Sequence, residues 1–454
     1  MVRSLCPVDI SLLSTGREDR MAAVNAPFDM RLAPLAGLAA ADLPKRIDLL
    51  RSARLADGEV VDVRLHDDVV ADIAAAGELE ITDPAATIDL GGCLLLTAPA
   101  EPHAHLDKAL SFDLIQPPLG DLGSARVAWM AYAATMTSES IVARARTQAF
   151  SMLANGITAI RTHVDVHPGF PTRSAEALVS LRAEFEGLID LEIVALASTF
   201  ASTADIEAAL DLGVEMVGGA PHLAEDPYAE VERLVAIAAH RGLGLDLHTD
   251  ENLDGPLTLG HYAQLVRELP RDRQYSASHC VRLGTLQPDD LAEIVSEVVA
   301  SDMGVISLPI TNLYLQGWQH PVLTPRGLTA LRALMSAGVR VGAGADNVQD
   351  PFNPIGRSCA FETASLLVSA GHLSLHEAWY LVSDGARAVM GLPAAGPRVG
   401  NRAELLAVRA QNLREAIAVA TADRLVIHEG RLVAHAELRC SIAAPNVSAT
   451  TGAR

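Results

Sequence analysis

Short apolar segments alternate with longer stretches of helical periodicity through the middle of the chain. The apolar segments predict eight strands, at residues 93–99, 157–166, 191–198, 214–222, 243–251, 274–280, 304–310 and 340–347. Helical patterns lie between them, and two clear ones, at 140–156 and 227–242, each end at a glycine. Eight successive strand–helix units predict a (β/α)8 barrel over residues 94–394. A doubly wound open sheet is the alternative, but no Gly-x-Gly-x-x-Gly follows the first predicted strand.

Both ends of the chain have a different pattern, with short alternating segments separated by glycine and aspartate. These segments occupy residues 46–92 and 403–438, and HEGRL at 428–432 is typical of a hairpin turn. The pattern predicts a small discontinuous β-sandwich domain formed by residues 31–93 and 395–445. Residues 1–30 lack periodicity, so we expect a poorly ordered tail there.

Composition narrows the class of protein. Half of the 454 residues are hydrophobic, which is enough for a large core. No apolar stretch approaches the roughly 20 residues that a membrane helix needs. The N-terminal apolar patch is interrupted by Asp9 and followed by charges, a pattern atypical of signal peptides, so we expect a cytoplasmic protein without membrane contacts.

Charge and cysteine content argue against nucleic-acid-binding proteins and against proteins built on disulfides or thiolate zinc sites. The net charge of −21 disfavours binding to the phosphate backbone of nucleic acids. No Cys-x-x-Cys occurs, which argues against a disulfide framework and against a thiolate zinc site. The five cysteines are scattered at Cys6, Cys93, Cys280, Cys359 and Cys440.

Two histidines follow the first predicted strand closely. His103 and His105 are two residues apart, and residues i and i+2 of a strand point to the same face. Two neutral imidazoles directed at one point suit a divalent metal ion. A chance pair of histidines in a polar loop is the alternative interpretation of this motif alone.

Other polar residues stand where later strands end. In a barrel these ends share one face, where active sites form. His248 and Glu251 follow the fifth predicted strand, His279 the sixth and Asp346 the eighth. The interval from His105 to His248 fits four βα units of roughly 30 or more residues. The next intervals, from His248 to His279 and from His279 to Asp346, fit one and two units. A lone histidine at a strand end is usually structural, but the ordered set predicts a metal site.

With these motifs the sequence resembles the amidohydrolase superfamily, and within it the cytosine deaminase group. The resemblance runs from about residue 45 to residue 436. It rests on EPHAHLDK (101–108), ANGITAIRTHVDV (154–166), GLDLHTDE (244–251), ASHC (277–280), LYLQGW (313–318) and GADNVQDPFNPIG (344–356).

The resemblance implies a role for each site residue. The metal ligands would be His103, His105, His248 and Asp346. Glu251 would be the acid/base that moves protons, and His279 would hold the attacking water. This donor set suits one Fe²⁺ or Zn²⁺ ion, and such an ion would supply hydroxide at neutral pH. Asp346 or His279 could accept the proton of the water.

Many members of the superfamily bind two metals bridged by a carboxylated lysine on strand 4. The only lysines here are Lys45 and Lys108, and neither lies in the fourth predicted strand, residues 214–222. A lysine bridge is therefore excluded, and we expect one metal ion per chain.

Substrate contacts depart from the cytosine deaminase pattern. Ser198 stands where those enzymes have a glutamine at the end of strand 3, Asn347 replaces a second aspartate and Phe352 replaces a tryptophan. A serine cannot reproduce the paired reach of an amide, so cytosine is a doubtful substrate. The related N-isopropylammelide amidohydrolases also have Asp-Asn at the eighth strand.

Other residues near the predicted pocket keep two interpretations. His222 could contact the substrate, and Gln316 lies in the 314–318 loop that could cover the pocket. His163 and Asp165 could line the pocket or form a buried hydrogen-bonded pair.

The sequence therefore predicts a metal-dependent hydrolase of C–N bonds in a small nitrogen heterocycle, most simply a deaminase. Hydrolysis of an amide or N-alkyl C–N bond in a triazine-like or cyclic amide substrate is the first alternative. A catalytically silent relative that binds a small molecule is the second. We also keep a homo-oligomer as an expectation for the assembly.

Overall fold

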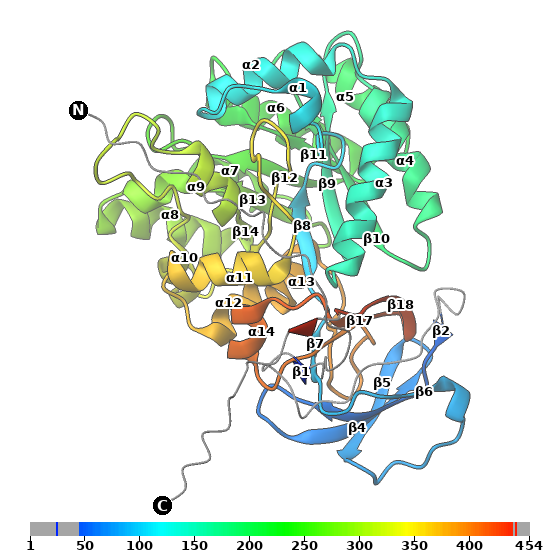
Figure 1. Cartoon of the computed structure of the whole chain (residues 1–454). Coiled ribbons are helices and arrows are strands. Elements are labelled where there is room, and N and C mark those ends of the chain that lie inside the picture. The colour runs from blue at the N-terminus through cyan, green and yellow to red at the C-terminus, as the bar shows by residue number, and fades with distance from the viewer. Residues whose placement is uncertain (1–23, 26–44, 439–440, 443–454) are drawn as a thin grey trace, which may run out of the picture. The chain divides into compact units, whose positions relative to one another are not determined.

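The computed structural model of the protein describes residues 24–25, 45–438 and 441–442 (Figure 1). Most of the predicted N-terminal tail lies outside these residues. Its described part, β1 (Val24–Asn25), pairs antiparallel with β19 (Ser441–Ile442) in a small unit of its own. Described residues 45–437 belong to a second unit, which contains every predicted site residue.

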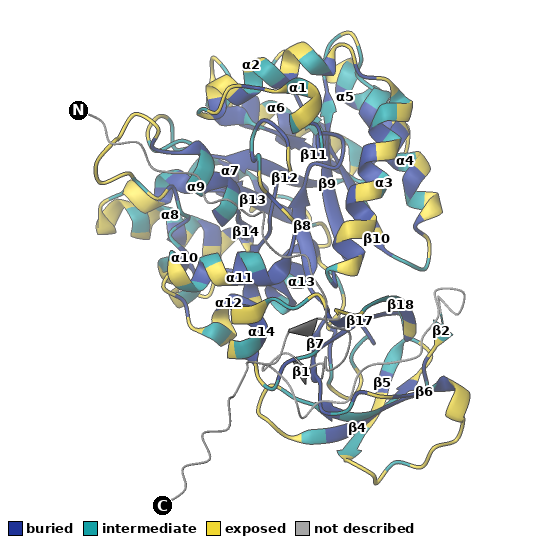
Figure 2. Ribbon diagram, viewed as in Figure 1, coloured by how far each residue is buried: buried dark blue, intermediate teal, exposed yellow. Residues whose placement is uncertain are grey.

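The centre of the second unit is an eight-stranded parallel sheet whose strands follow one another in chain order. They are β8 (Ala100–Ala104), β9 (Ala159–Val166), β10 (Asp190–Ala197), β11 (Met216–Gly219), β12 (Gly244–Thr249), β13 (Tyr275–His279), β14 (Gly304–Ser307) and β15 (Val341–Ala343). Nearly all of their residues are buried, as expected of parallel strands covered on both faces (Figure 2).

The two edges of this sheet meet and close the barrel. Ala104, the last residue of β8, forms a parallel bridge with Asp346, just after β15. The buried Glu101 carboxylate also accepts the Ala345 N–H, at 2.9 and 3.1 Å from its two oxygens. The predicted (β/α)8 barrel is therefore confirmed.

The first barrel strand differs from the prediction. The apolar segment at 93–99 forms β7 (Leu94–Thr97), which pairs antiparallel with β16 (Leu405–Val408) in the other sheet. The barrel begins instead at β8, after Thr97, and His103 lies inside that strand. The barrel thus starts several residues later than the predicted boundary at residue 94.

The two ends of the second unit build one nine-stranded mixed sheet. Besides β7 and β16, its strands are β2 (Lys45–Arg46), β3 (Leu49–Arg54), β4 (Val60–His66), β5 (Val69–Ala75), β6 (Thr87–Asp89), β17 (Arg424–His428) and β18 (Arg431–Ala436). Its core combines residues from both ends, such as Leu50 and Val63 with Leu405 and Leu425. The predicted β-domain formed by both chain ends is confirmed.

Helices surround the barrel and turn their apolar faces to it, and the exposed residues in Figure 2 mark their outer faces. They are α1 (Phe112–Ile115), α2 (Leu122–Ala133), α3 (Ser138–Ala154), α4 (Arg173–Glu184), α5 (Thr203–Leu210), α6 (Pro227–Arg241), α7 (Leu259–Val266), α8 (Pro288–Ser301), α9 (Pro309–Leu315), α10 (Leu331–Ser336), α11 (Ala360–Ser369), α12 (Leu375–Val382), α13 (Asp384–Met390) and α14 (Leu413–Val419). None of the helices in the described part of the chain is long and apolar enough to span a bilayer.

A buried ionic cluster joins the barrel to the β-domain. The Glu404 carboxylate lies 2.9 Å from His428 Nδ1 and 3.5 Å from a terminal nitrogen of Arg387. Arg387, on α13, also donates to the carbonyl of Ala98, just before the barrel. Burial by itself would raise the pKa of Glu404, but the hydrogen bond from His428 and the nearby positive charges outweigh it and hold that pKa at about 2.

We expect Glu404→Gln to lower the free energy of unfolding by about 3 kcal/mol at pH 7. A pKa of about 2 against an ordinary value near 4.5 stabilises the folded state by roughly 1.4 kcal/mol per unit. Because the folded pKa is depressed, this contribution is complete above about pH 4.5 and is lost as the pH falls towards 2. Urea unfolding at pH 7 and pH 3 should show the difference shrinking, with the exposed Glu186→Gln as control. A variant as stable as the wild type at pH 7 would show that the cluster does not stabilise the junction.

Candidate active site

Four donor groups converge at the end of the barrel where the strands have their C-termini. His103 lies in β8, His105 follows it, His248 lies in β12 and Asp346 follows β15. The His248 Nε2 atom is 3.2 Å from the Nε2 atoms of both His103 and His105, and His105 Nε2 is 3.2 Å from Asp346 Oδ1. The structure therefore brings all four predicted ligands together, and His163 of β9 packs against His103 beside them.

A chain of hydrogen bonds orients His103. Its Nδ1 lies 2.8 Å from Ser278 Oγ, and that hydroxyl donates to Asp246 Oδ1 at 2.7 Å. Asp246 is held in turn by Arg161, which is completely buried. Because the serine proton goes to Asp246, Ser278 accepts the proton of His103 Nδ1. The lone pair of His103 Nε2 is thereby directed at the cluster.

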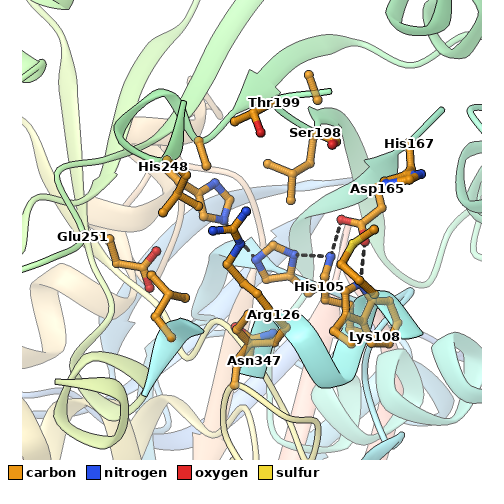
Figure 3. A pocket seen from close by; sticks show the side chains of 18 of the residues that line it. His105, Lys108, Arg126, Asp165, His167, Ser198, Thr199, His248, Glu251 and Asn347 are labelled. Carbon is orange, nitrogen blue, oxygen red and sulfur yellow. Dashed lines mark hydrogen bonds and ion pairs between the residues drawn. The ribbon is translucent and has the colours of Figure 1, made fainter. Parts of the chain in front are cut away.

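A lysine lies behind His105. Lys108 Nζ is 3.3 Å from His105 Nδ1 and forms a 2.7 Å ion pair with Asp165 (Figure 3). Asp165 also accepts the indole N–H of Trp129 at 2.6 Å. Of the two interpretations of Asp165, the structure supports a residue that lines the pocket and is hydrogen-bonded, although its partners are Lys108 and Trp129 rather than His163.

The chemistry of this donor set fits a divalent cation. Burial, together with the neighbouring positive charges, lowers the pKa of His103, His105 and His248 well below the ordinary value, so the imidazoles are neutral and keep a lone pair. Neither oxygen of the buried Asp346 carboxylate accepts a well-formed hydrogen bond among the described residues. An uncompensated buried carboxylate is costly, whereas three nitrogens and one oxygen at such short separations suit a metal ion.

Backbone conformation at the site is unusual. Asp346 and His279 have φ values of 63° and 66°, in the left-handed region that side-chain-bearing residues seldom adopt. Such conformations cost about 1–3 kcal/mol each and cluster at functional sites. They turn both side chains towards the pocket, from the last residue of β13 and from just after β15.

Glu251 and His279 face each other beside the donor cluster. Glu251 Oε1 is 3.6 Å from His279 Nδ1, and His279 Nε2 is 3.9 Å from Asp346 Oδ2. Burial raises the pKa of Glu251, and the nearby His279 and Arg126 oppose part of that rise. A carboxyl group beside a histidine, with its pKa raised by burial, suits proton transfer in both directions.

Two neighbours hold this pair in place. His279 Nδ1 lies 2.9 Å from Asn312 Oδ1 on α9, which fixes the proton on Nδ1 and leaves Nε2 as an acceptor. Asp250 accepts the backbone N–H groups of Thr258 and Leu259, and so anchors the loop that presents Glu251.

His105, His248 and Asp346 of the donor cluster line a pocket at this end of the barrel (Figure 3). Three of the predicted substrate contacts, Ser198, Asn347 and Phe352, line it. The amide of Asn347 donates to Asp350 Oδ2 at 2.7 Å, so this side chain is held by a neighbour.

The other two predicted substrate contacts do not line the pocket. His222, in a short 3-10 helix at Pro221–Leu223, places Nδ1 3.1 Å from the His248 carbonyl and Nε2 3.8 Å from Glu251. Gln316 donates to the Glu251 carbonyl at 2.7 Å. His222 therefore contacts His248 and Glu251, and Gln316 contacts Glu251, although neither of the two side chains lines the pocket.

One wall of the pocket was missed by the sequence reasoning. Helix α2 contributes Leu122, Arg126, Trp129 and Met130 to the lining. Their spacing places them on one face of a helix, and that spacing within the long segment between β8 and β9 is the signal that could have revealed them. Asn312 and Ser278 carried no comparable signal, because one polar residue in a helix or strand seldom indicates a contact.

Comparison with known proteins decides the family. The model of the Amidohydrolase family matches residues 142–434, more than half of the chain and most of the barrel. The chain belongs to the amidohydrolase family. The sequence is 28% identical to a pterin deaminase from Rhizobium rhizogenes over 82% of this chain and 87% of that protein. It is 26% identical to the N-isopropylammelide isopropyl amidohydrolase of Pseudomonas sp. (strain ADP) over 87% of this chain and 99% of that protein.

A solved structure agrees with the sequence comparison. The 5-methylcytosine deaminase from Klebsiella pneumoniae, liganded with 5-fluorocytosine, superposes on this amidohydrolase with a TM-score of 0.79 and 27% identity. The superposition covers 87% of this chain and 99% of that one. These similarities confirm the deaminase-like branch of the superfamily, and the protein is a hydrolase of C–N bonds of the deaminase type.

Proposed function

We propose that this amidohydrolase removes an exocyclic amino group from a nitrogen heterocycle, with one divalent metal ion and water. The proposal rests on one observation: three members of the donor set, His105, His248 and Asp346, line the same pocket as Glu251 and His279. A protein that only bound a small molecule would not need a buried acid beside such a donor set.

The four donors would hold Fe²⁺ or Zn²⁺, which nitrogen and oxygen ligands do not separate. Such an ion would act as a Lewis acid and would lower the pKa of water towards about 7, which would provide a nucleophile at neutral pH. Ser278 keeps His103 in the tautomer that this arrangement needs.

Protein groups would carry the protons. Asp346 Oδ2 and His279 Nε2, which lie 3.9 Å apart, can share the proton lost by the attacking water. Glu251 starts protonated and would donate its proton to a ring nitrogen as the water oxygen adds to the ring carbon, which becomes tetrahedral. Glu251 would then take the proton of the added hydroxyl group and pass it to the amino nitrogen, so that the C–N bond breaks and ammonia and the oxo heterocycle leave. The proton held by Asp346 and His279 would return to Glu251 and restore the starting state.

The lining of the pocket argues for a ring other than cytosine. Ser198 is short, and its hydroxyl already accepts the Phe200 N–H at 3.2 Å. The similarity to a pterin deaminase supports a fused or substituted ring. Displacement of an alkylamine from a triazine is a second candidate, supported by the similarity to the N-isopropylammelide enzyme.

A screen of aminated pyrimidines, triazines and pterins for released ammonia tests this proposal. We expect cytosine to be a poor substrate and another ring to be better, because an unmatched buried polar group costs about 1–3 kcal/mol. Isopropylamine release from an N-alkylated triazine, measured in parallel, separates the second candidate. If cytosine has the highest kcat/KM of the set, the argument from Ser198 is wrong.

A further inference from the structure

Arg126 brings a positive charge into the pocket that the proposed reaction does not use. It is a half-buried residue of α2, between Leu122 and Trp129 on the face that lines the pocket. Figure 3 shows its side chain extending into the space surrounded by His105, His248 and Glu251. What this guanidinium binds is a question about the substrate, so the inference rests on the proposed function.

The lysine and the carboxylates of the lining each lie within 4 Å of a charged group or an imidazole. Lys108 pairs with Asp165 at 2.7 Å, Asp346 faces His105 at 3.2 Å, and Glu251 lies 3.6 Å from His279. Arg126 differs, because no hydrogen bond or ion pair joins it to another residue within 45–438. Its charge nonetheless acts on a lining residue, Glu251, where it opposes part of the rise in pKa that burial causes.

A half-buried cation without a partner favours a ligand that compensates its charge. The acid/base Glu251 is a poor compensating partner, since a tight pair with Arg126 would hold its proton-transferring carboxylate in the ionised form. A planar guanidinium offers two parallel N–H donors, which match the two oxygens of a carboxylate. The apolar neighbours of Arg126 on the same face, Leu122, Trp129 and Met130, would cover a flat ring that carries such a group.

We infer that the substrate is a nitrogen heterocycle with a carboxylate substituent, and that Arg126 binds this carboxylate. The amino group to be removed faces the donor cluster, and the carboxylate faces α2. Arg126 is then a specificity-determining residue, which selects anionic rings over neutral rings of the same shape.

Direct binding tests this inference without any turnover. The probes are two matched pairs that lack an exocyclic amino group: uracil-6-carboxylate with uracil-6-carboxamide, and 2,4-dioxopteridine-6-carboxylate with its 6-carboxamide. Titration calorimetry of the metal-loaded protein gives the Kd of each. We expect one carboxylate at least to bind about 10–100-fold more tightly than its carboxamide, because hydrogen bonds to charged groups contribute roughly 1.5–3 kcal/mol.

Variants then assign the preference to the residue. Arg126→Gln should abolish the preference for the carboxylate, and Arg126→Lys should keep part of it through charge alone. Arg146→Gln, which removes an arginine paired with Glu184 outside the pocket, should leave it unchanged. Thermal melting of each variant confirms that it is folded.

Three results would overturn the inference. Carboxylates that bind no better than carboxamides, or do not bind, would show that the wild type does not select an anion. A preference that persists in Arg126→Gln would assign it to another residue. If Arg126→Gln weakens the binding of a carboxylate and of its matched carboxamide equally, Arg126 contacts a neutral ring atom instead. If the screen for released ammonia finds no substrate, that result contradicts the proposed function and leaves these binding results intact.

Discussion

Glu251→Gln should reduce turnover by roughly two to four orders of magnitude while the protein keeps its metal. Glutamine has nearly the same shape and can still donate and accept hydrogen bonds, but it cannot transfer a proton. Glu251 contacts His222 and His279 rather than the donor atoms of His103 or His105, so the donor set should survive the change. Metal content by elemental analysis and kcat on the best substrate of the screen measure the two effects separately.

The control for this substitution is Glu225→Gln, which changes an exposed glutamate near His222. It should keep both metal content and kcat. If Glu251→Gln retains wild-type turnover, the proton carrier is another group, and Asp346 and His279 become the candidates. If it loses the metal as well as turnover, the donor set depends on Glu251 in a way that the observed distances do not suggest.

The barrel and most of the donor set could be predicted from the sequence, because both depend on the succession of apolar segments and on the polar residues at their ends. Parallel strands buried on both faces appear as apolar segments, and their C-terminal ends must share one face. His248 and His279 lie at the C-terminal ends of such segments, and Asp346 follows one closely. Their convergence therefore follows from topology, with no need to know how any side chain packs.

The first strand shows where this reasoning fails. Leu94–Leu96 is an ideal buried strand, but hydrophobicity does not say which sheet buries it, and here it pairs with β16. The true first barrel strand contains Glu101 and Pro102, and its pairing with β9 shifts register between Glu101 and Ala104. A glutamate and a proline argue against a central strand unless the glutamate closes the barrel, as Glu101 does here.

Substrate contacts were predicted less completely, because they depend on segments without a strand pattern. Ser198, Asn347 and Phe352 follow strands and were found in the lining. Arg126 lies on helix α2, between β8 and β9. Only the position of this helix beside the pocket shows that Arg126 lines it. Gln316 was expected in the pocket, but its amide reaches the Glu251 backbone, because α9 packs its apolar residues against α2.

We expect the purified protein to hold about one Fe or Zn ion per chain, and His248→Ala to lose most of it. His248 Nε2 is within 3.2 Å of both His103 and His105, so its removal opens the centre of the donor set. Activity should fall with metal content, since the proposed reaction needs the bound ion. Elemental analysis after extensive dialysis provides the measurement, and His376→Ala, on the exposed side of α12, is the matched control.

The expected ratio of one metal ion per chain follows from the fourth strand of the barrel, β11. A second ion would need a bridging group there, but β11 ends in Gly218 and Gly219. A side chain at Gly219 would meet Leu234 Cδ1 at 2.5 Å, and one at Gly218 would meet Val194 Cγ1 at 2.7 Å. Two tightly bound ions per chain would contradict the single site, and full metal retention by His248→Ala would show that the histidine cluster is not where the metal binds.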